Sequence, residues 1–202
     1  MADTLLLIPA AGQSARMRGA DKLLQPVHGE ALLRRQAKMA LACDLPVWVA
    51  LPEGITRRQA VLDDLALQKI HCSDAPEGLG GTLRNVAGRL PSGLKRLLIV
   101  LPDLVDLTVE DLRMILIGPK SSPNSTVWRG CDAMKTPGHP CLLARDHFRD
   151  LEKLKGDQGL GPVLAGAETS LIHLPNSHAT HDLDTPEAWA HWRATHNTAH
   201  GK

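Results

Sequence analysis

The sequence predicts an α/β protein in which a mostly parallel central sheet lies between two layers of helices. Short apolar runs alternate with segments of helical composition, which is the order expected of βαβ units. Only 2 % of the 202 residues are aromatic, while 43 % are hydrophobic, so the core must consist mainly of aliphatic side chains. Such a core suits a parallel sheet covered by helices better than a β-sandwich.

The alternation is clearest in the first half of the chain. We expect strands at 5–9, 47–51, 68–72 and 96–101, and helices at 31–41, 55–67, 79–90 and 108–117. The strand at 96–101, with the sequence RLLIVL, is the strongest because it is almost entirely apolar. Thr108 and Asp111 have the spacing of a capping box at the start of a helix.

The second half is less regular. We expect strands at 126–128, 141–143 and 171–174, helices at 145–154 and 185–195, and a glycine-rich turn at 156–161. Pro186 lies in the first turn of the last helix, where proline is tolerated. Because the sequence shows neither an internal repeat nor a low-complexity linker, residues 1–202 are predicted to form one domain.

Charge and composition exclude several classes of protein. The formal net charge is +1, which argues against a protein that binds nucleic acid or a membrane surface through bulk charge. No apolar run has the roughly 18 residues that a membrane span requires, and no signal peptide is visible. The four scattered cysteines lack metal-ligand spacing. We therefore expect reduced thiols in a cytoplasmic protein.

The first predicted strand runs into a turn of small residues followed by two cations. The sequence is IPAAGQSARMRGADKLL, in which the turn comprises Ala10, Ala11, Gly12, Gln13 and Ser14 and the cations are Arg16 and Lys22. Backbone N–H groups in such a turn can form an anion site at the carboxyl end of a strand. Neither the dinucleotide fingerprint nor the Walker pattern is present. The alternative is a tight turn with solvated cations.

This stretch resembles the signature loop of the MobA-like nucleotidyltransferase family. Five further segments resemble motifs of that family in the same order: EGLGGTLRNVA (77–87), LPDLVDLTVEDL (101–112), PGHPCLL (137–143), GDQGLGPVL (156–164) and HDLDTPEAW (181–189). Together the six segments span nearly the whole chain. The resemblance implies a Rossmann-like three-layer sandwich of the nucleotide-diphospho-sugar transferase type.

The resemblance also implies a reaction. A Mg²⁺-dependent enzyme would transfer a nucleoside monophosphate from an NTP to a phosphate monoester, here molybdopterin or molybdenum cofactor, and release pyrophosphate. Ala10-Ala11-Gly12 and Lys22-Leu23-Leu24 resemble the cytidylyl branch, so CTP is favoured over GTP, although Asp21 resembles the guanylyl branch. Residues 1–115 would bind the nucleotide and residues 116–195 the acceptor, with a frayed tail at 196–202. A molybdoenzyme maturation partner is also implied.

Family motifs assign the catalytic and metal-binding candidates. Arg16 and Lys22 would hold the triphosphate, and Asp103, just beyond the strongest strand, would bind Mg²⁺, which prefers oxygen ligands. The alternative for Asp103 is a helix-capping or turn aspartate. Asp182 and Asp184 are two residues apart, so both would face one side of an extended segment. Either could be the second metal ligand, and Asp184 is favoured. The alternative is that Asp184 or Thr185 caps the last helix.

The remaining candidates border the two substrates. The glycine turn, with Gly78, Gly80, Gly81 and Thr82, would lie against the base and ribose, because glycine permits close packing on a flat ring. His139, within Gly138-His139-Pro140, and Asp157 are expected on the acceptor side. A purely structural role remains the alternative for the turn and for the histidine.

Several positions depart from the family pattern. Arg18 separates Met17 from Gly19, Pro102 precedes Asp103 where glycine is usual, and Leu160-Gly161 replaces an Ala-Arg pair. The last departure removes a basic group near the expected substrate side. Two alternatives therefore remain: a sugar- or polyol-phosphate nucleotidyltransferase, and a non-catalytic cofactor-binding maturation chaperone.

Overall fold

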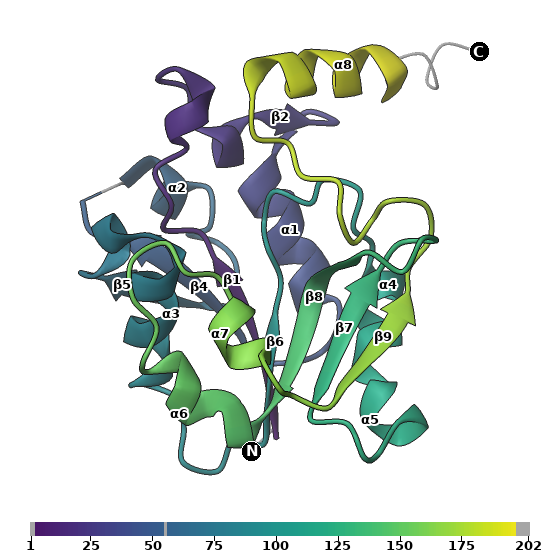
Figure 1. The fold of residues 1–202 in the computed structure, drawn as a ribbon. Coiled ribbons are helices and arrows are strands. Elements are labelled where there is room, and N and C mark those ends of the chain that lie inside the picture. The colour runs from purple at the N-terminus through teal and green to yellow at the C-terminus, as the bar shows by residue number, and fades with distance from the viewer. Residues whose placement is uncertain (1–2, 55, 197–202) are drawn as a thin grey trace.

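In the computed structural model, which describes residues 3–54 and 56–196, a seven-stranded sheet forms the centre of the molecule (Figure 1). The strand order is β5-β4-β1-β6-β8-β7-β9. The bounds are β1 Thr4–Pro9, β4 Val47–Pro52, β5 Gln68–Cys72, β6 Arg96–Ile99, β7 Val127–Cys131, β8 Pro137–Ala144 and β9 Thr169–His173. The order of the first four strands reflects parallel crossovers on both sides of β1, the topology at which α/β proteins bind ligands.

Only β8 interrupts the parallel order of this sheet. The pairs β4–β5, β1–β4, β1–β6 and β7–β9 are parallel, whereas β8 runs antiparallel to both β6 and β7. The expected mostly parallel sheet is therefore confirmed. β8 is longer than the predicted strand 141–143 because it extends back to Pro137, where it forms a hairpin with β7.

Helices cover both faces of the sheet and complete three layers. Apolar side chains of α1 and α4, with two tryptophans of α8, pack on one face, and those of α3, α6 and α7 pack on the other. The helices are α1 Leu32–Leu41, α2 Thr56–Ala60, α3 Leu79–Ala87, α4 Val109–Leu116, α5 Gly118–Ser121, α6 Phe148–Leu151, α7 Gly161–Leu164 and α8 Pro186–His196. Since all six residues of β1 are buried, this strand forms the centre of the core.

The N-terminal capping box is present as expected. The Thr108 hydroxyl accepts from the backbone N–H of Asp111 at 3.3 Å, and the Asp111 carboxylate accepts from the backbone N–H of Thr108 at 2.8 Å. Two donors of the first turn of α4 are thereby satisfied, which fixes the point at which the chain leaves the turn after β6 and enters the helix.

The predicted helix 55–67 is the main error in the secondary structure. Helix α2 ends at Ala60, and turns follow it. Asp63 and Asp64 would lie at the carboxyl end of a longer helix, where negative charge opposes the helix dipole. In addition, Arg34 donates to the Val61 carbonyl at 2.9 Å and pairs with Asp64. A longer helix would use the Val61 carbonyl in its own backbone hydrogen bonds, so this contact competes with the helix.

Smaller differences concern other elements. Residues 145–154 form a 3₁₀ turn followed by the short α6 instead of one helix, and the end of the glycine-rich turn becomes α7. Residues 26–31 contain a small hairpin, β2 Pro26–Val27 with β3 Glu30–Ala31, that the sequence did not predict. The expected tail lies outside the described residues, apart from His196, which ends α8. None of the described helices has the length and apolarity that crossing a bilayer requires.

Candidate active site

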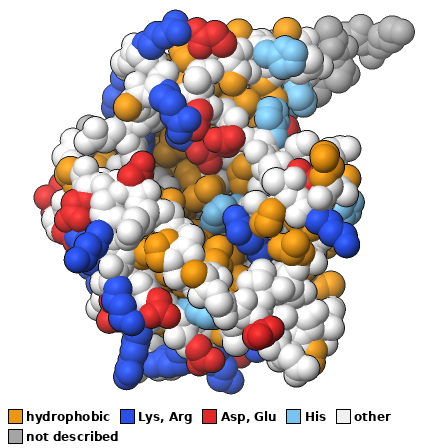
Figure 2. Space-filling model, in the orientation of Figure 1, with side chains coloured by type: hydrophobic (Ala, Val, Ile, Leu, Met, Phe, Trp, Pro, Cys, Tyr) orange, Lys and Arg blue, Asp and Glu red, His pale blue; other side chains and the backbone are white. Residues whose placement is uncertain are grey.

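The loop after β1 borders a cavity of 480 Å³ at the carboxyl end of the parallel strands. Parts of three segments, 9–23, 75–82 and 101–103, line this first cavity together with Asp157. A Cβ atom at Gly12 would meet no heavy atom within 4 Å, so the backbone here faces open space. Figure 2 shows the hollow on this face, with acidic and basic side chains above it. A ligand can therefore approach the loop backbone directly.

A buried arginine holds the loop in place. Arg58, from α2, is 1 % exposed. Its guanidinium donates to both carboxylate oxygens of Asp21, at 2.7 and 2.8 Å, to the Ala10 carbonyl at 2.6 Å and to the Ser14 hydroxyl at 3.2 Å. The sequence analysis missed Arg58, because it lies in a segment without a recognisable motif, 37 residues from Asp21 in the chain.

Arg58 also explains the roles of Ala10 and Ser14. Ala10 is fully buried, and its carbonyl and amide are bonded to Arg58 and to the Ala50 carbonyl. The Ser14 hydroxyl accepts from Arg58 and from the backbone N–H of Lys22 at 3.3 Å. Neither residue lines the first cavity, whereas Ala11, Gly12 and Gln13 do. The structure therefore uses Ala10 and Ser14 to shape the loop.

The two predicted cations meet two of the predicted carboxylates. The ammonium of Lys22 donates to Asp103 and to Asp184, each at 2.6 Å. Arg16 forms an ion pair with Asp184, although 72 % of its side chain is exposed. Burial lowers the pKa of Lys22, but the charges and hydrogen bonds of Asp103 and Asp184 outweigh that effect and raise it. Lys22 is therefore a fixed positive charge, whereas most of the Arg16 side chain is open to solvent.

Asp103, Asp182 and Asp184 form an acidic cluster in which one ligand atom of each lies within 4.8 Å of the others. Burial and repulsion by Asp184 and Asp103 raise the pKa of Asp182. Burial also raises the pKa of Asp184, but hydrogen bonds from Lys22 and the charge of Arg16 reverse the direction. Asp103 Oδ1 is buried without a hydrogen-bond partner among the described residues. These oxygens are the donor set that a hard divalent cation prefers.

The glycine turn divides into two parts. Gly78, with φ of +112°, and Thr82 line the first cavity. Gly80 and Gly81 instead press against neighbouring backbone: an added Cβ would lie 2.8 Å from the Gly156 oxygen and 2.3 Å from the Asp74 oxygen, respectively. Only glycine fits at these two positions, because backbone atoms cannot yield as a flexible side chain would.

Asp157 lies against this turn. Its carboxylate accepts from the backbone N–H of Leu79 at 3.3 Å, and its Cα would be 2.8 Å from a Cβ at Gly78. Asp157 therefore lines the first cavity, next to the turn expected at the nucleotide, and not the cavity that contains His139.

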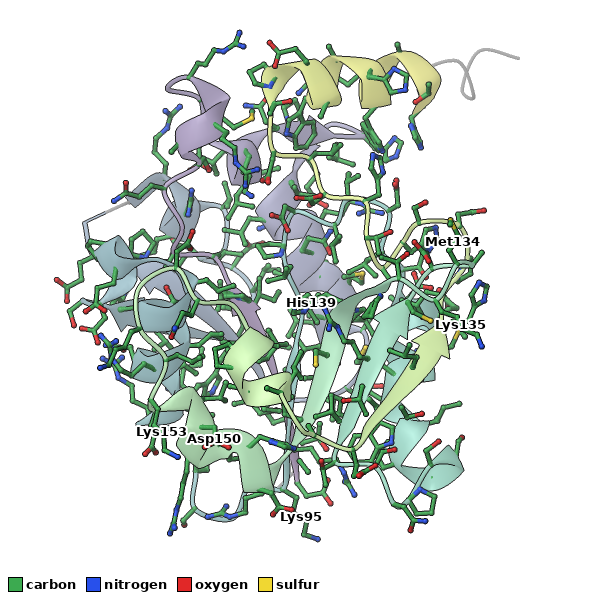
Figure 3. The ribbon with its side chains drawn as sticks, in the orientation of Figure 1. Lys95, Met134, Lys135, His139, Asp150 and Lys153 are labelled. Carbon is green, nitrogen blue, oxygen red and sulfur yellow. The ribbon has the colours of Figure 1, made fainter. Side chains whose placement is uncertain are left out.

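His139 borders a second cavity, of 350 Å³, near the middle of the face shown in Figure 3. The two cavities share Leu101 and Asp103. Burial and the charge of Arg129 lower the pKa of His139 to about 4, although a hydrogen bond to the Ile99 backbone acts in the opposite direction. The ring is therefore neutral near pH 7, and Asp103 lies where the two cavities meet.

The segment from Leu174 to Asp184 carries two of the carboxylates and is bonded both to the turn after β6 and to α4. His178 Nδ1 lies 2.8 Å from the Asp111 carboxylate, and His181 Nδ1 lies 2.8 Å from that of Asp106. The backbone N–H of Leu183 donates to the Asp103 carbonyl at 3.3 Å. These contacts hold residues 182–184 beside Asp103, although the two segments are about 80 residues apart in the chain.

The profile of the MobA-like NTP transferase domain family matches residues 6–173. The chain belongs to this family. It is therefore a nucleotidyltransferase with the fold of the nucleotide-diphospho-sugar transferases. No curated protein sequence matches this nucleotidyltransferase significantly.

Solved structures of low sequence identity share the fold. Rv0371c from Mycobacterium tuberculosis H37Rv superposes with a TM-score of 0.80 at 20 % identity, over 94 % of this chain and 96 % of that one. The same protein is also described in complex with manganese, with a TM-score of 0.77 at 18 % identity, over 94 % and 97 %.

Two further structures are described by their substrates or pathway. CMP:2-keto-3-deoxy-manno-octonic acid synthetase complexed with CTP has a TM-score of 0.73 at 17 % identity, over 98 % of this chain and 100 % of that one. Molybdopterin-guanine dinucleotide biosynthesis protein A from Archaeoglobus fulgidus has a TM-score of 0.69 at 11 % identity, over 96 % and 99 %. At these identities, the likeness concerns the fold alone.

Proposed function

We propose that this nucleotidyltransferase uses Mg²⁺ to transfer a nucleoside monophosphate from CTP, in preference to GTP, to molybdopterin or molybdenum cofactor. The acceptor attacks through a phosphate monoester, and pyrophosphate is released. The observation that carries the proposal is the meeting of Arg16, Lys22, Asp103 and Asp184 at the edge of the first cavity. A triphosphate and a divalent cation need that combination of charges.

The nucleotide occupies the first cavity. Its triphosphate lies along the open backbone of residues 11–13, and its base and ribose lie toward Gly78 and Thr82. Lys22, which lines this cavity, meets the phosphates from a position fixed by two carboxylates. Arg16, with its exposed side chain, moves from Asp184 to the phosphates. Asp157 lines the cavity next to the glycine turn and accepts a hydrogen bond from the backbone N–H of Leu79.

The acidic cluster fits a divalent cation. The unpartnered oxygen of Asp103 and the raised pKa of Asp182 both indicate negative charge that the protein itself does not fully compensate. Asp103 and Asp184 would hold the ion, with Asp182 beside them. Bound there, Mg²⁺ would neutralise charge that develops on the transferred phosphoryl group.

Transfer then depends on position and charge. A phosphate oxygen of the acceptor attacks the α-phosphorus in line, the bond from the α-phosphorus to the bridging oxygen breaks, and pyrophosphate leaves with the electron pair. The attacking oxygen is already ionised, so no general base is needed. The neutral His139 on the acceptor side is consistent with this chemistry.

Sequence details support the choice of substrates. The Ala10-Ala11-Gly12 turn favours CTP, and a structural neighbour is described with bound CTP. A second neighbour is described as a molybdopterin-guanine dinucleotide biosynthesis protein, in keeping with a molybdopterin acceptor. The product would be passed in the cytoplasm to a molybdoenzyme maturation partner. A sugar-phosphate or polyol-phosphate acceptor is the second candidate, because a sugar-activating synthetase shares the fold.

Nucleotide binding and pyrophosphate release test the proposal. Purified protein with Mg²⁺ should show a larger rise in its thermal unfolding midpoint with CTP than with GTP, ATP or UTP. Pyrophosphate should appear only when a phosphate monoester acceptor is added. An equal rise with GTP would contradict the choice of CTP. Nucleotide binding without pyrophosphate release, with any acceptor tested, would instead indicate a non-catalytic carrier.

A further inference from the structure

Ten residues line the second cavity, and among them Arg129 on β7 carries a permanent positive charge, whereas His139 is neutral near pH 7. Two acids, Asp103 and Asp182, line the same cavity. Leu160-Gly161 stands where the family usually has an Ala-Arg pair, and neither residue lines this cavity.

Arg129 is held in place by backbone carbonyls. Its Nε donates to the Gly138 carbonyl at 2.6 Å, and Nη2 donates to the Pro137 carbonyl at 3.3 Å. These bonds fix the guanidinium to the β7–β8 hairpin but use only part of its five N–H donors. No carboxylate within the described ranges forms an ion pair with it. Its positive charge is therefore available to an anion. The planar guanidinium is already ordered, so binding an anion costs little side-chain entropy.

Two unpartnered polar atoms border the same cavity. His139 Nδ1 and Asp103 Oδ1 are both buried, and neither has a hydrogen-bond partner among the residues that the structure describes. Buried polar atoms in folded proteins are nearly always hydrogen-bonded. The residues that carry both atoms, His139 and Asp103, line the second cavity. The Asp103 oxygen suits the divalent cation proposed above, whereas the unpaired charge of Arg129 favours an anionic group in this cavity.

The local charges require a cation on this side of Asp103. A phosphate monoester that reaches the α-phosphorus must lie near Asp103 and Asp182, which repel it. Arg16 and Lys22 line the first cavity, not the second, and are paired with Asp184 and Asp103. The neutral His139 adds no charge. Besides the divalent ion proposed at the acidic cluster, Arg129 is therefore the protein's own cation in the second cavity that can offset the repulsion.

We propose that Arg129 binds the phosphate monoester of the acceptor in the second cavity. This inference rests on the proposed function and assigns a residue to its acceptor site. The guanidinium donates hydrogen bonds to the phosphate through the N–H groups that the hairpin leaves free. It directs one phosphate oxygen toward the α-phosphorus at Asp103. The same oxygen forms the new bond as pyrophosphate leaves, so the step needs no further reactant.

Binding can be measured without knowing the natural acceptor. In ¹⁵N-labelled protein, the Nε–H signal of Arg129 is identified by its loss in Arg129→Lys. Methyl phosphate should shift this signal in a saturable manner, whereas methanol should not. The signal of Arg145, whose guanidinium also bonds only backbone carbonyls but near the opposite end of β8, should not move. Absence of a shift at Arg129 would overturn the inference.

Steady-state kinetics provide a second test of the role of Arg129. Inorganic phosphate is the minimal acceptor, and its ³²P label should enter the nucleoside diphosphate as pyrophosphate is released. Arg129→Gln should raise the KM for phosphate roughly 10- to 100-fold, the loss expected for a charged hydrogen bond. The Kd for the nucleotide with Mg²⁺ should change less than about twofold. Arg145→Gln is the matched control, and thermal unfolding checks that each variant folds.

The outcomes separate the two proposals. If the KM for phosphate is unchanged in Arg129→Gln while the nucleotide still binds, the assignment of Arg129 is wrong and the proposed function stands. If wild-type protein binds no nucleotide but methyl phosphate still shifts the Arg129 signal, the proposed function is wrong and the anion site stands. A partial recovery of KM in Arg129→Lys would support a charge contact with the phosphate.

Discussion

Two segments bring charged side chains to the junction of the cavities, and they are held there by different means. The loop at 10–22 depends on one buried guanidinium, that of Arg58, which bonds three of its residues. The segment at 174–184 depends on several smaller contacts: backbone hydrogen bonds and two histidine–aspartate pairs. Substitution of Arg58 alone should therefore disorganise the loop, whereas each single substitution in the segment 174–184 should remove only a small part of the stabilisation.

The largest effect is expected at Arg58. Arg58→Met leaves the Asp21 carboxylate without its main partner, so the free energy of unfolding should fall by about 3–5 kcal/mol. Nucleotide binding should weaken as well. Urea denaturation measures the first effect. The control is Lys153→Gln, which removes an exposed pair with Asp150 and should cost less than about 1 kcal/mol. Equal losses in both variants would show that Arg58 does not hold the loop.

The acid at the junction is expected to govern chemistry more than stability. Asp103→Asn should lower the rate of pyrophosphate release roughly 10²- to 10³-fold, because one preorganised charge is lost from the transition state. Binding of Mn²⁺, measured by its paramagnetic resonance, should weaken in parallel. Asp150→Asn, at an exposed surface pair, serves as the control. Unchanged Mn²⁺ binding in Asp103→Asn would remove Asp103 from the metal site.

His139 gives a test on the acceptor side through pH. Folding lowers the pKa of His139 from 6.5 to about 4. Between these two pH values, the histidine is therefore protonated in the unfolded chain and neutral in the folded protein. Stability is therefore lost as pH falls below about 6.5. Between pH 7.5 and pH 4.5, this group should cost about 2–3 kcal/mol. Urea denaturation at both pH values should show a smaller difference for His139→Asn, and an equal difference would contradict the buried, neutral state.

The smallest effect is expected in the second segment. His178→Gln removes one contact to the buried Asp111 carboxylate, while the Thr108 capping bonds remain. The free energy of unfolding should fall by about 1–2 kcal/mol. A double-mutant cycle with Asp111→Asn isolates the contact. If His178→Gln cost as much as Arg58→Met, the two segments would not differ in how they are held.

Much of the fold could be predicted because each element has a local pattern. The buried run at 5–9 became β1, and the Thr108–Asp111 spacing became a capping box. The helix predicted at 55–67 failed because Arg34, distant in sequence, draws the Val61 carbonyl and Asp64 into a turn. The hairpin at 26–31 was not predicted, because its two strands have only two residues each, too few to show an alternation of apolar and polar residues.

Part of the candidate site could also be predicted, because several of its residues lie in local sequence motifs. Motifs pointed to Arg16, Lys22, Asp103 and Asp184, which the structure brings together. No motif contains Arg58 or Arg129. A single arginine in a sequence gives no sign of burial or of facing a cavity, because its partners come from segments far along the chain.

The sequence by itself determined the alternation of strands and helices, the small-residue turn after the first strand, and the acid Asp103 just beyond the strongest strand. These features depend on side-chain periodicity and backbone freedom, which are local properties. Tertiary structure alone decided which charges neutralise one another, that Gly80 and Gly81 pack against backbone, and that Arg129 stands opposite two acids in a second cavity. Those results depend on distances between residues remote in the chain, and such distances exist only once the sheet has formed.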